Sequence, residues 1–187
     1  HATAGLTALL LYLYPAIVTV LAAILARRRL SLLRLLAVAA ALLGTGLAIG
    51  GSLSGSPLGI LLGVAAAVIY SIYILVGERV TPLAGAMPSS TVIMLAAAAV
   101  FGLMVCWQGP ALPASPVAWA AIGGIALLST VVAMITFFAG MERLGAADAA
   151  TLSTLEPLVT VVLAAVFLGE QVGGWQLAGG TIILAAV

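Results

Sequence analysis

The chain is a series of long apolar runs separated by short segments rich in Gly, Pro or charge. A helix needs about 20 apolar residues to cross the hydrocarbon core of a bilayer, and most of the runs reach that length. The runs show no period of two, which excludes the alternating strands of a membrane barrel. The pattern predicts helices at residues 4–26, 32–51, 57–77, 88–107, 116–141, 146–168 and 173–187, the last too short to span.

Composition supports the same class of protein. The chain is 65% hydrophobic and 6% charged, whereas a soluble domain carries about 25% charged residues. We therefore predict an all-α polytopic helix bundle whose main partner is the lipid bilayer. The six basic residues are all Arg and do not form one face, so a nucleic-acid partner is not expected.

Few residues are available for catalysis or metal binding. Cys106 is the single cysteine and His1 the single histidine. Disulfide frameworks, zinc sites and Ser-His-Asp or Cys-His arrangements are therefore unsupported. We expect no metal, no cofactor and no enzymatic activity.

The arginines predict the orientation in the membrane. Arg27, Arg28, Arg29 and Arg34 follow the first helix, Arg79 the third and Arg143 the fifth. Because arginine is enriched in cytoplasmic loops, the loops after helices 1, 3 and 5 are predicted to be cytoplasmic. The three tryptophans then fall at the opposite interface, as aromatic anchors do.

Two parts of the chain resemble each other at a shift of 142 residues. Leu13-Tyr14-Pro15 falls on Leu155-Glu156-Pro157, and Val20–Ala23 falls on Val162–Ala165. Helix 1 thus corresponds to helix 6, and an odd offset of five helices reverses the direction through the membrane. Inverted repeats of this kind are typical of secondary transporters, with a substrate site near the midplane.

The repeat also predicts the domain organisation. If the unit has five helices, residues 1–53 are the last two helices of the first repeat. Residues 54–187 are then the second repeat. We expect a parent protein of ten helices, with three preceding His1, so that this chain is an N-terminally truncated fragment.

Glu156 is the main candidate for function. A charged side chain at bilayer depth costs roughly 2.5–3.5 kcal/mol, so such a residue normally faces a cavity or a partner. Ser153, Glu156 and Thr160 share one face of a regular helix. This polar stripe predicts a cavity-lining helix on the substrate or proton pathway; the alternative is that Glu156 only bonds a neighbouring helix.

Further candidate residues lie in or near the two copies of the repeated motif. Pro15 and Pro157 can each kink a helix and are candidate hinges, although Pro is also common in membrane helices. Tyr14 is the counterpart of Glu156, and Tyr70 is a further candidate on the pathway. For Tyr70, and for Ser129 and Thr130, packing is the alternative. Two pairs of glycines at a spacing of four, Gly46/Gly50 and Gly59/Gly63, predict close helix packing.

Several motifs together resemble the EamA-type domain of the drug/metabolite transporter superfamily. They are Leu155-Glu-Pro-Leu158, Leu168-Gly-Glu170, Trp175-Gln-Leu-Ala-Gly179 and, in the first repeat, Leu11-Tyr-Leu-Tyr-Pro15. The resemblance implies ten helices in two inverted repeats and transport of metabolites across the bacterial inner membrane. One departure is that Arg27-Arg-Arg29 stands where the family often has an acidic residue.

Together these features predict a secondary transporter that exports small metabolites, such as amino acids or drugs, by alternating access. Glu156 could link this export to protons by gaining and losing one. The alternatives are a membrane-embedded enzyme acting on lipids or prenyl carriers, and a non-transporting accessory subunit. No oligomeric state is predicted.

Overall fold

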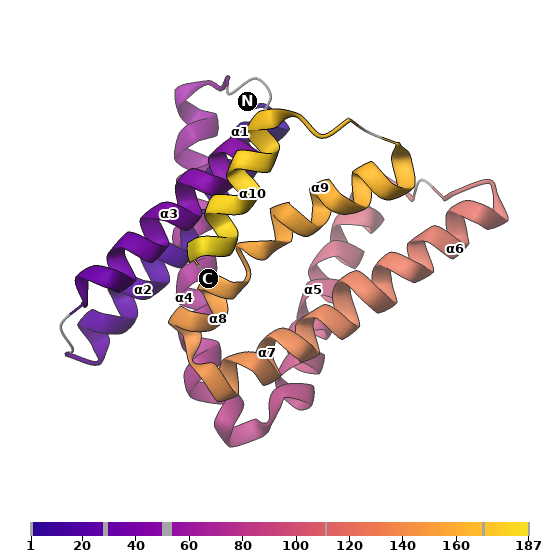
Figure 1. Cartoon of the computed structure of the whole chain (residues 1–187). Coiled ribbons are helices and arrows are strands. Elements are labelled where there is room, and N and C mark those ends of the chain that lie inside the picture. The colour runs from indigo at the N-terminus through magenta and orange to yellow at the C-terminus, as the bar shows by residue number, and fades with distance from the viewer. Residues whose placement is uncertain (1, 28–29, 50–53, 111, 170, 187) are drawn as a thin grey trace. The chain divides into compact units, whose positions relative to one another are not determined.

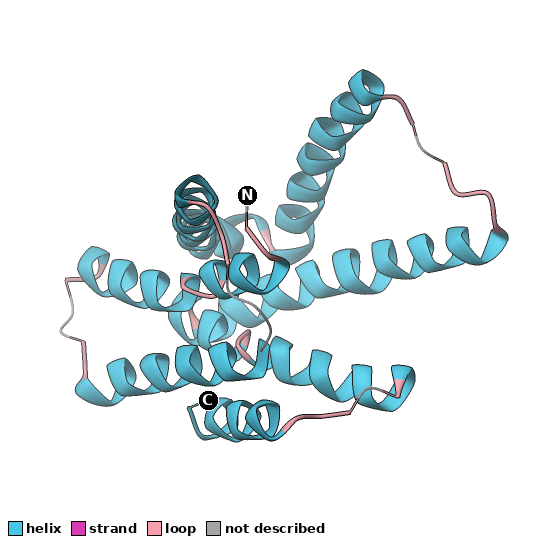
Figure 2. Ribbon diagram, turned by 90° about the horizontal axis from the view of Figure 1, so that it is seen from above, coloured by secondary structure: helices cyan, strands magenta, loops and turns pink. Residues whose placement is uncertain are grey.

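A computed structural model of the chain describes residues 2–27, 30–49, 54–110, 112–169 and 171–186. Arg28, Arg29, Gly50 and Glu170, named above, lie outside these ranges. The described residues form helices and no β-strand, with one isolated antiparallel bridge between Ala2 and Gly55 (Figure 2). Six helical stretches are long and apolar enough to cross a membrane. The predicted all-α membrane fold is confirmed.

Three of the predicted helices are divided into shorter elements. The elements are α1 (Ala4–Leu11), α2 (Tyr14–Leu25), α3 (Leu32–Ile49), α4 (Pro57–Ala84), α5 (Ala86–Gln108), α6 (Pro116–Gly124), the π-helix η1 (Ile125–Val132), α7 (Ala133–Leu144), α8 (Ala146–Leu152), α9 (Leu155–Leu168) and α10 (Gly174–Ala186). The first predicted helix is thus α1 with α2, and the sixth is α8 with α9. The fifth is α6, η1 and α7 in one continuous stretch.

The predicted turn after the third helix, between residues 77 and 88, was too long. Instead of ending at residue 77, α4 continues through Pro82 to Ala84, and α5 begins at Ala86. The chain reverses at Gly85, whose φ of +89° is a conformation that side chains disfavour. Gly77 is no helix stop, because its missing side chain leaves room for Phe138 and Met141 of α7. In the same way, α7 ends at Leu144 rather than at residue 141, and the turn falls on Gly145, with φ +86°.

The chain divides into two compact units. Unit 1 contains His1–Leu75 and Ala146–Val187, hence α1 to α3, the first part of α4, and α8 to α10 (Figure 1). Unit 2 contains Val76–Gly145, hence the end of α4, α5, α6, η1 and α7.

The closest helix pair of unit 1 is α3 with α10. A Cβ atom on Gly44 would lie 2.7 Å from the Gly179 carbonyl oxygen, and one on Gly179 would lie 2.6 Å from the Ala48 backbone nitrogen. Gly44 also approaches Ile183, so the later residues of one helix meet the earlier residues of the other. The two helices therefore run antiparallel, side by side in Figure 1.

Unit 2 holds α5 against α7, and its long stretch contains the π-helix. The Thr130 hydroxyl donates to the Ile125 carbonyl, five residues earlier, at 3.4 Å. Leu127 and Leu128 are more than half exposed, as expected for side chains in contact with lipid. Ser129 and Thr130 lie within this π-helix and are exposed as well.

Candidate functional site

Two helices of unit 1 are interrupted near the middle of their spans. The first breaks at Tyr12 and Leu13, directly before Tyr14-Pro15, and the second breaks at Ser153 and Thr154, before Glu156-Pro157. Proline has no backbone N–H, so each break frees a carbonyl group one turn earlier. Unsatisfied carbonyls are costly in a bilayer unless neighbouring groups bond them, so both breaks are expected to have local partners.

Side chains and tight turns supply those partners at the second break. The Thr154 hydroxyl donates to the Thr151 carbonyl at 2.6 Å, and the Ser153 hydroxyl donates to the Ala149 carbonyl at 3.0 Å. The Glu156 N–H reaches the Ser153 carbonyl at 3.0 Å. These bonds hold the backbone in a turn, so that a new helix begins at Leu155 with Glu156 in its first turn.

Serine performs a related role at the first break. The Ser71 hydroxyl of α4 is buried, donates to the Ala67 carbonyl at 2.7 Å and lies 3.4 Å from the Tyr14 carbonyl. Gly63, one of the glycines predicted to permit close packing, lies against Leu10 of α1. The start of α4 therefore supports the interrupted first helix.

Four tyrosines gather at these breaks. Tyr14 is buried, and its ring centroid lies 4.9 Å from that of Tyr70 in an edge-to-face arrangement. Tyr70 and Tyr73 are nearly parallel at 5.7 Å, and Tyr12 lies 6.3 Å from Tyr14. The rings of α4 and of the α1–α2 break thus form one continuous aromatic cluster.

Glu156 joins this cluster from the second interrupted helix. Its carboxylate lies within electrostatic range of Tyr12, Tyr14 and Tyr70. The Tyr14 phenol also lies near the Ser153 side chain. Polar side chains of the two breaks therefore lie near each other, those of the first predicted repeat beside those of the second.

A cavity of about 410 Å³ lies beside the cluster. Tyr12, Pro157 and Thr160 line it together with Gln171 and Gln176, and small or aliphatic residues of α1, α3 and α9 complete the wall. The mixture of mostly apolar lining with a few polar groups is typical of small-molecule sites.

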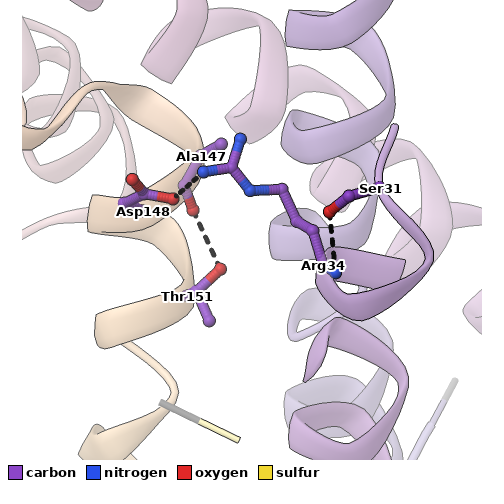
Figure 3. Close-up of polar contacts among 5 residues, drawn as sticks. All are labelled: Ser31, Arg34, Ala147, Asp148 and Thr151. Atoms are coloured by element: carbon purple, nitrogen blue, oxygen red, sulfur yellow. Dashed lines mark hydrogen bonds and ion pairs between the residues drawn. The ribbon is translucent and has the colours of Figure 1, made fainter. Parts of the chain in front are cut away.

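The opposite end of unit 1 is closed by packing and by an ion pair. There α2 packs on α8, and Arg34 at the start of α3 bonds Asp148 of α8, with 2.8 Å between Arg34 Nη2 and Asp148 Oδ1 (Figure 3). Arg34 is held in place by its own backbone N–H, which bonds the Ser31 hydroxyl at 3.2 Å. This is the single ion pair formed within the described ranges.

The structure brings together most of the site residues expected from the sequence. Tyr14, Tyr70, Ser153 and Glu156 lie in the cluster, and Pro15 and Pro157 follow directly after the two breaks. Thr160 lines the cavity, but its hydroxyl donates to the Glu156 carbonyl of its own helix at 2.9 Å.

Tyr12 and Gln176 were missed. Tyr12 connects the cluster to the cavity and lies within electrostatic range of Glu156, and Gln176 lies in the cavity wall. The sequence feature that could have indicated Tyr12 is its phenol hydroxyl, two positions before the Tyr14-Pro15 motif. No three His, Cys, Asp or Glu side chains of the described ranges gather into a candidate metal site.

Comparisons with known proteins identify the fold and the family. The crystal structure of another protein superposes with a TM-score of 0.86 at 23% identity, which shows the fold. The match covers 99% of this chain and 66% of that one. The uncharacterized transporter YcbK of Bacillus subtilis is 28% identical over 96% of this chain. This chain spans 61% of YcbK.

The family is shown by a match to a family model. The model of the EamA-like transporter family matches residues 57–187, which is more than half of the chain and includes α4, Glu156 and α10. The interrupted helix with its Glu-Pro motif lies inside the matched region. The chain therefore belongs to the EamA-like transporter family, within the drug/metabolite transporter superfamily.

Proposed function

We propose that the protein is a secondary transporter that exports small metabolites across the bacterial inner membrane by alternating access. The family and the relative named as a transporter support transport as the activity. The observation that carries the proposal is the pair of interrupted helices, one from each predicted repeat, that meet at Glu156. Discontinuous helices at corresponding positions of inverted repeats mark the substrate sites of many transporters.

The antiparallel packing of α3 on α10 supports the inverted repeat. Under the shift of 142 residues these two helices are counterparts, so opposite directions are what the predicted repeat requires. The same shift pairs α1 with α8 and α2 with α9.

Unit 1 departs from this symmetry in a way that supports alternating access. The contact of α2 with α8 has as its counterpart a contact of α9 with α1, but the cavity lies between those two helices. Inverted-repeat transporters alternate between two conformations, and in each of them one end of the pathway is closed while the other is open. With the predicted orientation, the closed end is cytoplasmic and the cavity opens to the outside.

Glu156 is proposed to be the carboxylate that exchanges a proton during transport. It lies where the two breaks meet, between the closed end and the cavity, and within electrostatic range of the Tyr12 phenol. A carboxylate in this position binds a proton from one side and releases it to the other as the two ends alternate. Export of a metabolite would then be exchanged for entry of a proton.

The test begins with the full-length protein, produced in a bacterial host in equal membrane amounts with and without Glu156→Gln. Untargeted mass spectrometry of the medium detects exported metabolites of any chemical class. We expect the unaltered protein to enrich at least one small metabolite outside the cells, and Glu156→Gln to abolish that enrichment. Glu142→Gln removes an exposed carboxylate of α7 and is the matched control. Identical media from all three strains would contradict the proposal.

A further inference from the structure

The cavity of unit 1 presents hydrogen-bonding groups whose direction is set by bonds within the protein. We propose that it binds an uncharged molecule that carries a carboxamide, or a similar pairing of a carbonyl with an N–H, on an apolar body. Gln176 donates to the carbonyl of this molecule, and Thr160 accepts from its N–H. This inference rests on the proposed function, because it names the substrate class of the cavity.

The lining of the cavity favours an uncharged ligand. Its polar residues are Tyr12, Thr160, Gln171 and Gln176, and no charged side chain of the described ranges is among the residues that line it. A charged ligand would lose water against this wall without gaining an opposite charge, and burying an unpaired charge costs far more than burying a hydrogen-bonded polar group. The remaining wall, from α1, α3 and α9, is small and aliphatic and accepts an apolar body.

The amide of Gln176 presents its donor end to a ligand. The backbone N–H of Gly173 donates to Gln176 Oε1 at 2.8 Å. Because an N–H needs an acceptor, this bond identifies the oxygen of the amide and leaves the Nε2 group, with two N–H donors, at the other end. Gln176 lines the cavity, so these donors are available to a carbonyl bound there.

The hydroxyl of Thr160 has the complementary direction. Its proton is donated to the Glu156 carbonyl of the same helix at 2.9 Å, so the lone pairs of Oγ1 are the part available to a ligand. The Tyr12 hydroxyl and the Gln171 amide, which also line the cavity, can each donate or accept. The cavity thus offers one fixed donor and one fixed acceptor, which is the complement of a group that pairs a carbonyl with an N–H.

The test is equilibrium binding to the purified full-length protein in detergent, with protein-free micelles as the blank. Four probes share a phenyl group and differ in the group attached to it: 2-phenylacetamide, phenylacetone, phenylacetate and phenethylammonium. We expect 2-phenylacetamide to bind about 2- to 10-fold more tightly than phenylacetone, which lacks the N–H, since one neutral hydrogen bond is gained. It should bind at least about 10-fold more tightly than either charged probe. Equal binding of the four probes, or tighter binding of a charged one, would overturn the proposal.

Gln176→Glu tests the donor. A carboxylate oxygen can still accept from the Gly173 N–H, so the turn before α10 is retained while the Nε2 donors are lost. The variant should bind 2-phenylacetamide and phenylacetone about 10-fold more weakly, with an unchanged unfolding temperature. If it binds both probes as tightly as the unaltered protein, Gln176 only holds the turn and the proposal is wrong.

Thr160→Val tests the acceptor with a side chain of almost the same shape. It should weaken binding of 2-phenylacetamide by about 2- to 10-fold and leave phenylacetone unchanged, because only the amide has an N–H to donate. Thr136→Val of α7 in unit 2 is the matched control, since this exposed threonine also donates its hydroxyl to its own helix, to the Val132 carbonyl at 2.8 Å. Equal weakening of the two probes by Thr160→Val would reject the acceptor, and with it the carboxamide.

The outcomes also separate this inference from the proposed function. Export that depends on Glu156, by a protein that shows no preference for 2-phenylacetamide, would uphold transport and reject the carboxamide site. Selective binding of 2-phenylacetamide, without any metabolite exported in the cellular assay, would uphold the carboxamide site and reject transport.

Discussion

Arg34 and Asp148 join the start of α3 to α8 through a bond of 2.8 Å, and the predicted repeat has no equivalent of this bond. The shift of 142 residues carries Arg34 onto Gln176 and Asp148 onto Leu6. Gln176 lines the open cavity, and Gly5 and Ala8 on either side of Leu6 do so too. The charged pair thus occurs at the closed end of unit 1, and its uncharged counterpart occurs at the open end.

This asymmetry predicts that the ion pair favours the conformation with the open cavity. Both side chains are half exposed, so the pair contributes about 1 kcal/mol at most, which is roughly a fivefold change in population. Arg34→Gln should lower the fraction of molecules with an open cavity by up to that factor. The measurement is the rate at which a membrane-impermeant maleimide labels Gln171→Cys, in full-length protein whose exposed Cys106 is replaced by Ser.

Two controls accompany this labelling experiment. Arg143→Gln removes an arginine outside the pair and should leave the labelling rate unchanged. The exchanged pair Arg34→Asp with Asp148→Arg should restore labelling toward the starting rate, and high salt should reduce the difference because exposed charges are screened. Unchanged labelling in Arg34→Gln would show that the pair does not bias the conformation.

The sequence was sufficient for the membrane spans because their signal is long and simple. Apolar runs of about 20 residues have few structural solutions in a bilayer, and all six long spans were found. The helix ends were less predictable. Gly77 and Pro82 look like breakers in the sequence, but the turn is made by Gly85, and only the backbone dihedral angle distinguishes these glycines.

The site was predictable only in part, because the interruptions change which side chains share a face. Residues two apart do not face each other in a regular helix, so Tyr12 was not expected beside Tyr14. The break at Tyr12 and Leu13 removes that restriction, so that Tyr12 lies beside Tyr14 and within electrostatic range of Glu156. Glu156 itself was predicted as a site residue because a carboxylate in an apolar run costs free energy in a bilayer, whatever the local backbone conformation.

The contact between α3 and α10 predicts an unusual sensitivity at Gly179. A Cβ atom there would lie 2.5 Å from the Gly44 carbonyl oxygen, and backbone atoms cannot move aside as a side chain can. Gly179→Ala should therefore destabilise the protein by about 1–3 kcal/mol, the usual cost of overpacking. Thermal unfolding in detergent measures the effect. Gly46→Ala is the matched control on α3, since its Cβ would meet only Leu9 at an ordinary 3.5 Å, and equal losses for both variants would contradict this explanation.

The turn after α7 predicts a second sensitive glycine. Gly145 has φ +86° and ψ 164°, a region that is essentially restricted to glycine, and a Cβ atom would also lie 3.2 Å from the Glu78 carboxylate. Gly145→Ala should cost about 1–3 kcal/mol of stability through backbone strain. Gly140→Ala, in the helix just before the turn and with open space around it, should be neutral or slightly stabilising. Comparing the unfolding midpoints of the two variants tests the assignment; a stable Gly145→Ala protein would show that the turn can relax.

The two prolines after the breaks predict a change in rate rather than in stability. Pro15→Ala or Pro157→Ala restores a backbone N–H, so each helix can form the bond that the proline prevents and become straighter. If the breaks act as hinges, stiffening either one should slow export severalfold while the unfolding temperature stays the same or rises. Pro116→Ala is the control, since this proline begins α6, where its missing N–H would be unsatisfied anyway. If Pro157→Ala straightens its helix but leaves the export rate unaltered, Pro157 serves packing rather than a hinge. The same result for Pro15→Ala would exclude a hinge at both breaks.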